Sequence, residues 1–570
     1  MLLRRRADDP IGAPLHVVAA WAGGNGPEAL AWAEALAMAP ATDARTALRL
    51  ANASLALGEV EPARRIVEGL VGAGRGDDPA TLTLRADVAL RTGRYRAAAG
   101  LAGRAIEAAG GSSAGLGRSG ARGAGRARGI LHAAEGELRV LQPGWLPGLD
   151  ASAPRGPLSP VRGRVLHLLT NSLPYREAGY TVRTQSIARS QLDAGLDPHL
   201  ATRAGFPLID GVAGAPRSQV IEGVPYHRLL PDLEPGSGPD VLTTATARAA
   251  ARLVHELRPA VLHPASNFLN AQVALALRDR FDIPVVYEVR GFLEETWASR
   301  TAGGGGEAEV EEADRYRGAR DAETACMLAA DAVVTLSETM LAEIVSRGCD
   351  PAKLVVIPNA VDIERFEPGP RDDALAASLG IEPGETVMGY VSTLNRLEGV
   401  GTLLDAAAIL LARGHRIRVL LVGDGEDRAA LEARAGQPDL AGRVIFTGRV
   451  PHDRVAAYYS LIDVFVVPRR ADRVSQLVTP LKPFEAMALQ RTLVVSDVAA
   501  LKEIVTDGET GHTFGAGDAT SLAGVVEPLL DDPVRRAELG AAAREWVAAY
   551  RTWRQNGLRY RQLYERLGVA

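Results

Sequence analysis

The segment from Val478 to Ala488 combines a lysine, a proline and a carboxylate at a spacing that suits phosphate binding. It reads Val-Thr-Pro-Leu-Lys-Pro-Phe-Glu-Ala-Met-Ala, with Lys482 directly before Pro483 and Glu485 three residues after the lysine. Proline is well tolerated in the first turn of a helix, so the segment predicts a helix that begins near Lys482. The amides of Leu481 and Lys482 and the lysine ammonium would then meet at the positive end of that helix, where a diphosphate is stabilised.

Lysine is rare in this chain, which adds weight to Lys482. Among the 64 Lys and Arg residues, lysine stands only at Lys353, Lys482 and Lys502. A capped helix with a solvated lysine is the plain alternative, and codon bias in a GC-rich genome explains the excess of arginine. We favour phosphate binding, with Glu485 one turn deeper as the acceptor of hydrogen bonds from ribose hydroxyls.

A second candidate loop follows the apolar run Arg164–Thr170. It leads through Gly179 and Tyr180 into a segment with helical periodicity. A strand, a glycine loop and a helix N-terminus offer free amides to an anion, although glycine at such a turn also serves packing alone. The Gly-x-Gly-x-x-Gly fingerprint is missing, which disfavours a nicotinamide cofactor.

Both loops lie within two series of β-branched runs that alternate with helical segments. Continuous apolar strands between helices predict parallel sheets that are covered on both faces. We therefore predict two tandem doubly wound domains, residues 161–368 and 369–552, with ligands bound at the carboxyl ends of the strands in the cleft between them. Residues 553–570 predict a C-terminal helix that crosses back to the first domain. The runs are Pro284–Val289, Ala332–Leu336, Leu354–Ile357, Val387–Val391, Arg418–Val422, Val444–Phe446, Val464–Val467 and Leu493–Ser496.

The first 110 residues are rich in Ala and Leu and show an internal period. Gly24, Gly58 and Gly93 lie 34 and 35 residues apart, each between two apolar helical stretches. This period suits helix–turn–helix units and resembles tetratricopeptide repeats. A partner-binding solenoid and a helical cap that stabilises its neighbour both remain open. Residues 111–160 are Gly/Ser/Ala/Arg-rich and then Pro-rich, which predicts a flexible linker.

Composition limits the function classes. The 570 residues carry a formal charge of −5 and a sequence pI near 6.1, so no overall attraction to nucleic acid is expected. The sequence has no uninterrupted apolar run of about 18 residues and only two cysteines, which predicts a cytoplasmic protein with at most peripheral membrane contact. The start Met1–Arg6 is followed by Ala-Asp-Asp-Pro rather than by the apolar core of a signal peptide.

From Arg164 to Leu567 the chain resembles the family 4 glycosyltransferases. That family has the GT-B fold, retains the anomeric configuration and uses nucleotide sugars. A string of motifs in the family's order is more specific than any one of them. The motifs are Glu177-Ala-Gly-Tyr180, Tyr287-Glu-Val-Arg290-Gly, Ala330-Asp-Ala-Val-Val-Thr-Leu-Ser-Glu338, Ile357-Pro-Asn-Ala-Val-Asp362, Leu420-Leu-Val-Gly-Asp-Gly425, Phe446-Thr-Gly-Arg449 and Phe484-Glu-Ala-Met487.

The resemblance implies a set of donor-binding residues. Gly179 would approach the donor phosphate, Gly448 and Arg449 would lie against the base, and Glu485 would bind the ribose. Ser392 and Leu481 complete the predicted donor set. No Asp-x-Asp pair follows a strand, so we expect no metal ion and no cofactor besides the nucleotide sugar itself.

The sequence departs from the family at two charged positions. The first glutamate of the family's pair falls on Leu477, and a lysine that contacts phosphate falls on Glu398. A carboxylate cannot stabilise a leaving diphosphate, so we predict that Arg396 and Lys482 supply the positive charge.

The first domain offers further candidates at its strand ends. A family histidine is replaced by Arg290, which we take as a third catalytic candidate. Tyr180, Arg183, His263 and Glu288 are candidates for contact with the sugar or the acceptor. A structural ion pair remains the alternative for Arg290 with Glu288, and a structural role is the alternative for His263.

The sequence thus predicts a retaining glycosyltransferase that moves a sugar from a nucleotide-diphosphate sugar to a hydroxyl group. The acceptor would be a glycan, a lipid-linked molecule or a small molecule, in polysaccharide or glycoconjugate biosynthesis. Two other hypotheses stay open. One is a degenerate GT-B protein that binds a nucleotide sugar without turnover, and the other is an adaptor that binds a protein partner through residues 1–110.

Overall fold

The computed structural model describes most of the chain, and its residues form two compact units. The described residues are 31, 34–35, 37, 43–110, 118–149, 158–231, 237–301, 310–451 and 454–570. The first repeat glycine, Gly24, lies outside them. One unit contains Met1–Pro147, Asp232–Ala245 and Thr301–Ala325, and the other contains Gly148–Pro231, Thr246–Arg300 and Cys326–Ala570. We describe each unit by itself.

The first unit is built from helices joined by tight turns. Gly58 and Gly93 stand at two of these turns with φ angles of 86° and 73°, a left-handed conformation that glycine adopts without strain. The turns separate α3 from α4 and α5 from α6, as the period predicted, and each helix buries its alanine and leucine face. The helices are α3 (Ala44–Ala56), α4 (Val60–Leu70), α5 (Pro79–Arg91), α6 (Tyr95–Ala108) and α7 (Arg118–Val140).

Helix α7 corrects part of our prediction of a flexible linker over residues 111–160, because residues 118–140 are helical. Residues 111–117 and 150–157 of that predicted linker lie outside the described residues. Its alanines and isoleucine pack into small clusters with α5 and α6: Ala127 with Leu82 and Ala105, and Ile130 with Ala86. Small side chains let helices approach closely, and alanine and arginine are good helix formers. The prediction gave too much weight to glycine and too little to the spacing of the alanines.

The sheet of the first GT-B domain is almost entirely parallel. Its strand order is β3-β4-β2-β1-β5, and single parallel bridges from Leu262 to Val285 and from Ala265 to Glu288 continue it into β6-β7-β8. Only the edge strand β3 runs antiparallel to its neighbour. The strands are β1 (Val161–Leu169), β2 (Asp197–Thr202), β3 (Ser218–Ile221), β4 (Val224–Arg228), β5 (Pro259–Pro264), β6 (Val286–Glu288), β7 (Ala332–Thr335) and β8 (Leu354–Val356).

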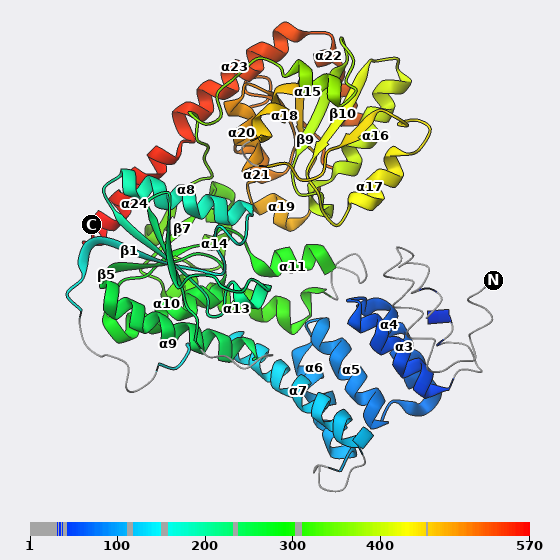
Figure 1. Ribbon diagram of the computed structural model, residues 1–570, viewed down its shortest axis with the longest axis vertical. Coiled ribbons are helices and arrows are strands. Elements are labelled where there is room, and N and C mark those ends of the chain that lie inside the picture. Colours follow the sequence, from blue (N-terminus) through cyan, green and yellow to red (C-terminus); the bar gives the residue numbers. More distant parts are fainter. Residues whose placement is uncertain are drawn as a thin grey trace. The chain divides into compact units, whose positions relative to one another are not determined.

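Helices cover this sheet on both faces. In Figure 1, α8 and α24 lie on one side of β1, and α10 lies on the other. The helices of this domain are α8 (Gly179–Asp193), α10 (Phe268–Phe281), α11 (Leu293–Thr301), α14 (Glu338–Ser346) and the C-terminal α24 (Trp553–Arg566). Two further helices, α9 (Pro239–Leu257) and α13 (Asp314–Ala329), have residues in both units. Helix α24 packs tightly on α8, because a Cβ at Gly557 would lie 2.1 Å from the Ser190 carbonyl oxygen.

The second domain has a fully parallel sheet in the order β11-β10-β9-β12-β13-β14. Chain order reverses between β9 and β12, and such a switch point opens a crevice at the carboxyl ends of the strands. The strands are β9 (Thr386–Val391), β10 (Ile417–Val422), β11 (Val444–Phe446), β12 (Val464–Val467), β13 (Thr492–Ser496) and β14 (His512–Phe514).

Helices α16 and α17 lie on one side of β9 and β10, with α18 and α20 on the other (Figure 1). The helices of this domain are α15 (Asp373–Ser378), α16 (Val400–Ala412), α17 (Arg428–Ala435), α18 (Val455–Leu461), α19 (Arg473–Leu477), α20 (Lys482–Ala488), α21 (Ala499–Lys502), α22 (Ala519–Leu530) and α23 (Pro533–Tyr550). The GT-B fold predicted from the sequence is confirmed. Within the described ranges, no helix is long and apolar enough to cross a membrane.

Candidate active site

The loops after β9, β10 and β12 interlock at the carboxyl edge of the second sheet. A Cβ at Gly423 would lie 1.8 Å from the Ser392 carbonyl oxygen, and a Cβ at Gly399 would lie 2.0 Å from the Pro468 carbonyl oxygen. Both glycines also have positive φ angles, 138° and 63°. Only glycine permits this close approach of backbones, which brings Ser392 to the edge where the switch point lies.

Lys482 begins helix α20, as predicted, and pairs with a carboxylate. Its Nζ lies 3.0 Å and 3.1 Å from the two oxygens of Glu485, and 32 % of its side chain is exposed. Glu485 is nearly buried and also accepts a hydrogen bond of 3.0 Å from the Tyr459 hydroxyl. Burial and the Glu485 charge raise the pKa of Tyr459 well above its ordinary value, so this tyrosine stays a proton donor. The two predicted ligand groups therefore hold each other in this conformation.

Glu398, which stands where the family has lysine, is neutralised by an arginine that the sequence analysis missed. Arg469 lies two residues after the end of β12 and donates to both Glu398 oxygens at 2.9 Å and 3.2 Å. It also donates to the Val478 carbonyl at 2.8 Å, and the Tyr390 hydroxyl hydrogen-bonds to Glu398. Burial and Glu398 raise the pKa of Tyr390 well above its ordinary value. The feature of the sequence that could have identified Arg469 is its position just beyond the end of a core strand.

Arg396 lines an open hollow of about 220 Å³ together with residues of the first domain. Its neighbours there include Ser299 and Arg300, at the end of α11, and the carboxylates Glu426 and Asp427. Within the described ranges, no hydrogen bond or ion pair of the Arg396 side chain is present, and the side chain is exposed. The guanidinium is therefore available to an anion.

Gly448 and Arg449 follow β11 at the same edge. The backbone of Gly448 forms a bridge with Gly423 and has a φ angle of 71°. Arg449 is exposed. The structure thus brings Ser392, Gly448 and Arg449 to neighbouring loops of one sheet edge, the arrangement expected of a site for the base and ribose.

The segment before α20 contacts the first domain at the predicted phosphate loop. A Cβ at Gly179 would lie 3.6 Å from Leu481 Cδ1, so Gly179 and Leu481 are neighbours. Gly179 begins α8 and is exposed, and Tyr180 beside it is 41 % exposed. Leu477 is buried, and its carbonyl oxygen lies 3.4 Å from Ser337 Oγ. Leu477 therefore supports the contact between the domains through its backbone and offers no charge to a sugar.

A further arginine ties this segment to the first domain. Arg473, at the start of α19, donates to Glu295 at 2.8 Å and to Glu343 at 2.9 Å. Asn359 donates through its amide to the Thr479 carbonyl at 2.8 Å. The loop that carries Leu481 and Lys482 is thus held by first-domain side chains that the sequence analysis had not selected.

Glu288, Arg183 and Arg290 form a closed cluster at the end of β6. Glu288 is 0 % exposed and lies 2.9 Å from an Arg183 nitrogen and 3.0 Å from an Arg290 nitrogen. Burial alone raises the pKa of Glu288, but the two guanidinium groups outweigh it and hold this pKa well below the ordinary value. Arg183 also donates to the carbonyls of Pro358 and Ile357 and to Asn359.

His263 completes the same cluster from β5. Its Nε2 lies 3.1 Å from Glu288 and its Nδ1 lies 2.5 Å from the Tyr564 hydroxyl of α24, and its side chain is 0 % exposed. Burial lowers the pKa of His263, so the ring is neutral. Glu288, Arg183 and His263 are inaccessible to a substrate in this structure. A structural role, which we had left open as the alternative for Glu288 and His263, accounts for all three residues. Arg290 also donates to Thr184 at 2.6 Å and is nearly buried.

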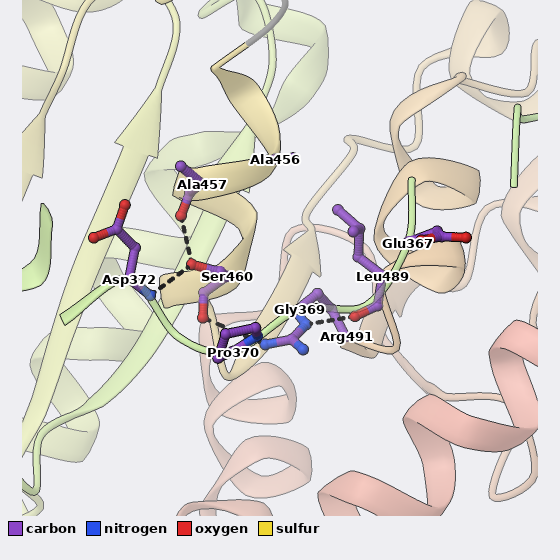
Figure 2. A pocket seen from close by; sticks show the side chains of 9 residues that line it. All are labelled: Glu367, Gly369, Pro370, Asp372, Ala456, Ala457, Ser460, Leu489 and Arg491. Carbon is purple, nitrogen blue, oxygen red and sulfur yellow. Dashed lines mark hydrogen bonds between the residues drawn. The ribbon is translucent and has the colours of Figure 1, made fainter. Parts of the chain in front are cut away.

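A second hollow, of about 260 Å³, lies in the second domain beside the segment that connects it to the first (Figure 2). Asp372 donates its amide to Ser460 Oγ, and Arg491 donates to the Leu489 carbonyl. None of the predicted site residues lines this hollow. The candidate site is therefore the carboxyl edge that carries Lys482.

Comparisons with known proteins match both domains. A model described as glycosyl transferases group 1 matches residues 385–532, and a glycosyl transferase 4-like domain matches residues 178–360. The D-inositol 3-phosphate glycosyltransferase of Gordonia bronchialis is 30 % identical over 287 residues, which cover 49 % of this chain and 60 % of that protein. The enzyme of the same name from Corynebacterium diphtheriae is 29 % identical over 388 residues, covering 66 % and 86 %.

Among solved structures, sucrose-phosphate synthase from Thermosynechococcus elongatus superposes with a TM-score of 0.59 at 22 % identity. The superposition covers 71 % of this chain and 99 % of that one. This likeness concerns the fold. The matches to the two family models leave the helices α3 to α7 uncovered.

Proposed function

We propose that this chain, a glycosyltransferase with the two domains of the GT-B fold, transfers a sugar from a nucleotide-diphosphate sugar to a hydroxyl group with retention. The observation that carries the proposal is the position of Lys482. The Lys482 ammonium is partly exposed at the carboxyl edge of the second sheet. The preceding residue, Leu481, contacts Gly179 of the first domain. A diphosphate bound there would meet a cation and the exposed backbone of Gly179.

Binding of the donor requires an exchange of partners at Lys482. In the present conformation its ammonium is neutralised by Glu485 at 3.0 Å. A diphosphate would attract the ammonium, and Glu485 would be released to accept hydrogen bonds from the two ribose hydroxyls. Lys482 would then pair with the diphosphate and Glu485 with the ribose hydroxyls, so that neither charge is left buried without a partner when their ion pair breaks.

The chemistry asked of the protein is electrostatic. As the sugar–phosphate bond loosens, negative charge grows on the leaving diphosphate, and groups that meet this charge lower the barrier. Lys482 and Arg396 would supply that charge. The leaving phosphate can accept the proton of the incoming hydroxyl, so retention by attack on the same face needs no enzyme nucleophile. No metal ion and no further cofactor enter this scheme.

The ion pair of Glu398 with Arg469 explains how the site tolerates a carboxylate where the family has lysine. Arg469 approaches Glu398 to 2.9 Å, so the pair adds no net negative charge beside the diphosphate. Through Val478 the same arginine supports the backbone that leads to Lys482. We propose that positive charge has moved from position 398 to position 482.

The acceptor side of the proposal is broader. A glycan, a lipid-linked molecule or a small molecule with a free hydroxyl would be the acceptor, in polysaccharide or glycoconjugate biosynthesis. A cytoplasmic location with at most peripheral membrane contact, and a protein partner bound through residues 1–110, belong to the same proposal and rest on the sequence.

A panel of UDP-, GDP- and ADP-sugars tests the proposal. The full chain is incubated with each donor and a mixture of hydroxyl acceptors, and products are detected by mass. We expect turnover of one donor class, and NMR of the product should show the donor's anomeric configuration. Inversion would exclude the retaining mechanism. Binding of one donor without hydrolysis or transfer would instead identify a degenerate nucleotide-sugar-binding protein.

A further inference from the structure

Three polar side chains at the carboxyl edge of the first sheet have buried atoms without partners. Thr202 ends β2 and Arg228 ends β4, and the two residues are paired in the strand register. Side chains of paired residues in neighbouring strands point to the same face of a sheet. Thr202 Oγ1, Arg203 Nε and both Nε and Nη2 of Arg228 are buried and lack any hydrogen-bond partner.

Arg228 is the most unusual of these groups. Its relative exposure is 4 %, and its guanidinium makes one hydrogen bond, from Nη1 to the Pro216 carbonyl at 3.1 Å. The guanidinium carbon lies 4.8 Å from the centre of the Tyr175 ring. Burial lowers the pKa of Arg228 below its ordinary value. Within the described ranges, no carboxylate forms an ion pair with this arginine.

Arg183, in the same domain, shows what a buried arginine ordinarily requires. It is equally buried, and it is satisfied by Glu288, Asn359 and two backbone carbonyls. A buried guanidinium without a counter-charge destabilises a fold unless something compensates it. Arg228 has the Pro216 carbonyl and the Tyr175 ring as neighbours but no counter-charge among the described residues, so we expect an anion from outside the chain to supply it.

The neighbours of Arg228 fit a small anion. Thr202 and Arg203 add a hydroxyl and an N–H donor on the adjacent strand end. Asp210 approaches Arg203 to 3.8 Å.

We infer that Arg228, Thr202 and Arg203 form an anion subsite that holds a phosphate or carboxylate carried by the acceptor. The inference rests on the proposed function, because it takes the ligand at this edge to be the glycosyl acceptor. The Tyr175 ring and the Pro216 carbonyl contact the guanidinium in this structure, and a bound anion would meet its remaining nitrogens, Nε and Nη2. An ionised ligand group bound to arginine forms the strong, charge-assisted class of hydrogen bond.

Inorganic phosphate tests the subsite without any need for turnover. The melting temperature of the full chain is measured with sodium phosphate and with sodium chloride at equal ionic strength, in a Lys482→Ala background that weakens the donor site. We expect phosphate to raise the melting temperature. Adding Arg228→Met should abolish the response, Thr202→Val should reduce it, and Arg252→Gln, an exposed arginine on α9, should leave it intact.

Two results of this titration would overturn the inference. One is the absence of a phosphate response in Lys482→Ala, and the other is a response that survives Arg228→Met. If Arg228→Met fails to fold, Thr202→Val, which keeps the side-chain shape, decides in its place. Without phosphate, Arg228→Met should not be less stable than its parent, because it removes an unpaired buried charge. A purely structural arginine would give the opposite result.

Matched acceptors identify the anion. A neutral polyol, its phosphate monoester and the corresponding uronic acid are compared as acceptors with the donor found in the panel. We expect one charged form to be preferred by about tenfold or more in kcat/KM, and Arg228→Met to remove that preference. Equal use of all three would overturn the subsite. Loss of donor turnover altogether would instead contradict the proposed function, while the phosphate titration would still report on Arg228.

Discussion

Each of the two domains carries a cluster of paired charges at the carboxyl edge of its sheet, one around Glu288 and one around Glu485, and the two clusters differ in how far they are buried. In the first domain, Glu288 is fully buried and each of its charged neighbours is directed at it. In the second, Lys482 is 32 % exposed and holds Glu485 through an ion pair that a ligand could replace. A charge with complete internal compensation maintains the fold, whereas a charge at an accessible edge is available for chemistry.

This difference separates two roles that the sequence could not tell apart. Arg290 follows strand β6 by two residues and Lys482 begins helix α20, and the sequence made both of them candidates for catalysis. Arg290 is committed to Glu288 and Thr184, and its side chain is nearly buried. We therefore expect mutations in the first cluster to lower stability and mutations in the second to lower the reaction rate.

The largest effect is expected from Glu288→Gln. This change leaves Arg183 and Arg290 buried without their counter-charge, and breaking a buried ion pair costs about 3–5 kcal/mol of unfolding free energy. Denaturant unfolding followed by fluorescence measures the loss. Glu527→Gln, in a surface pair with Arg413, is the control and should cost less than about 1 kcal/mol. A Glu288→Gln protein of normal stability but without activity would reverse the assignment of the two clusters.

Lys482→Ala should lower the rate of donor turnover without unfolding the chain. Removal of one group that stabilises charge in a transition state typically lowers kcat by about 10²–10³. The measurement is kcat for hydrolysis or transfer of the donor found in the panel. Lys502→Ala, an exposed lysine on α21, is the matched control and should retain full activity. Normal kcat in Lys482→Ala would show that the diphosphate binds elsewhere.

Acid should destabilise the first domain through its buried histidines. Burial lowers the pKa of His227 from 6.5 to about 4, and burial also lowers the pKa of His199, which stacks on it. Between pH 6.5 and pH 4 the unfolded chain therefore binds protons that the folded chain does not, so stability falls as pH falls through this window. Melting temperatures from pH 8 to pH 4 measure the slope, and His227→Gln should flatten it. An unchanged slope in His227→Gln would mean that other groups carry the acid sensitivity.

The smallest effect is expected from Arg396→Gln. Because this arginine is exposed, solvent and salt screen its charge, and the expected loss in kcat/KM is about two- to fivefold. The measurement compares donor kinetics at low and high salt, and the difference between wild type and variant should shrink at high salt. A loss as large as that of Lys482→Ala would place Arg396 in direct contact with the reacting phosphate.

Much of the architecture could be predicted because it is local. Apolar runs such as Val464–Val467 became the central strands, and Pro483 correctly marked the first turn of α20. The short strand β14 (His512–Phe514) was missed, since three residues carry little periodic signal. Helix α7 was missed because its stability comes from alanines that pack against α5 and α6, and these contacts are distant in sequence.

The sequence by itself determined the fold class, the two-domain organisation and the candidate cation Lys482, because hydrophobic period and short motifs are properties of neighbouring residues. Only the tertiary structure decided that Glu398 is neutralised by Arg469, that Glu288 pairs with Arg183 in the interior, and that Arg228 is buried with two of its nitrogens unpartnered. In each case the outcome depends on which charged groups lie close together in space although they are far apart in the sequence. Coulomb energy and desolvation depend on distance and burial in space, which residue order does not specify.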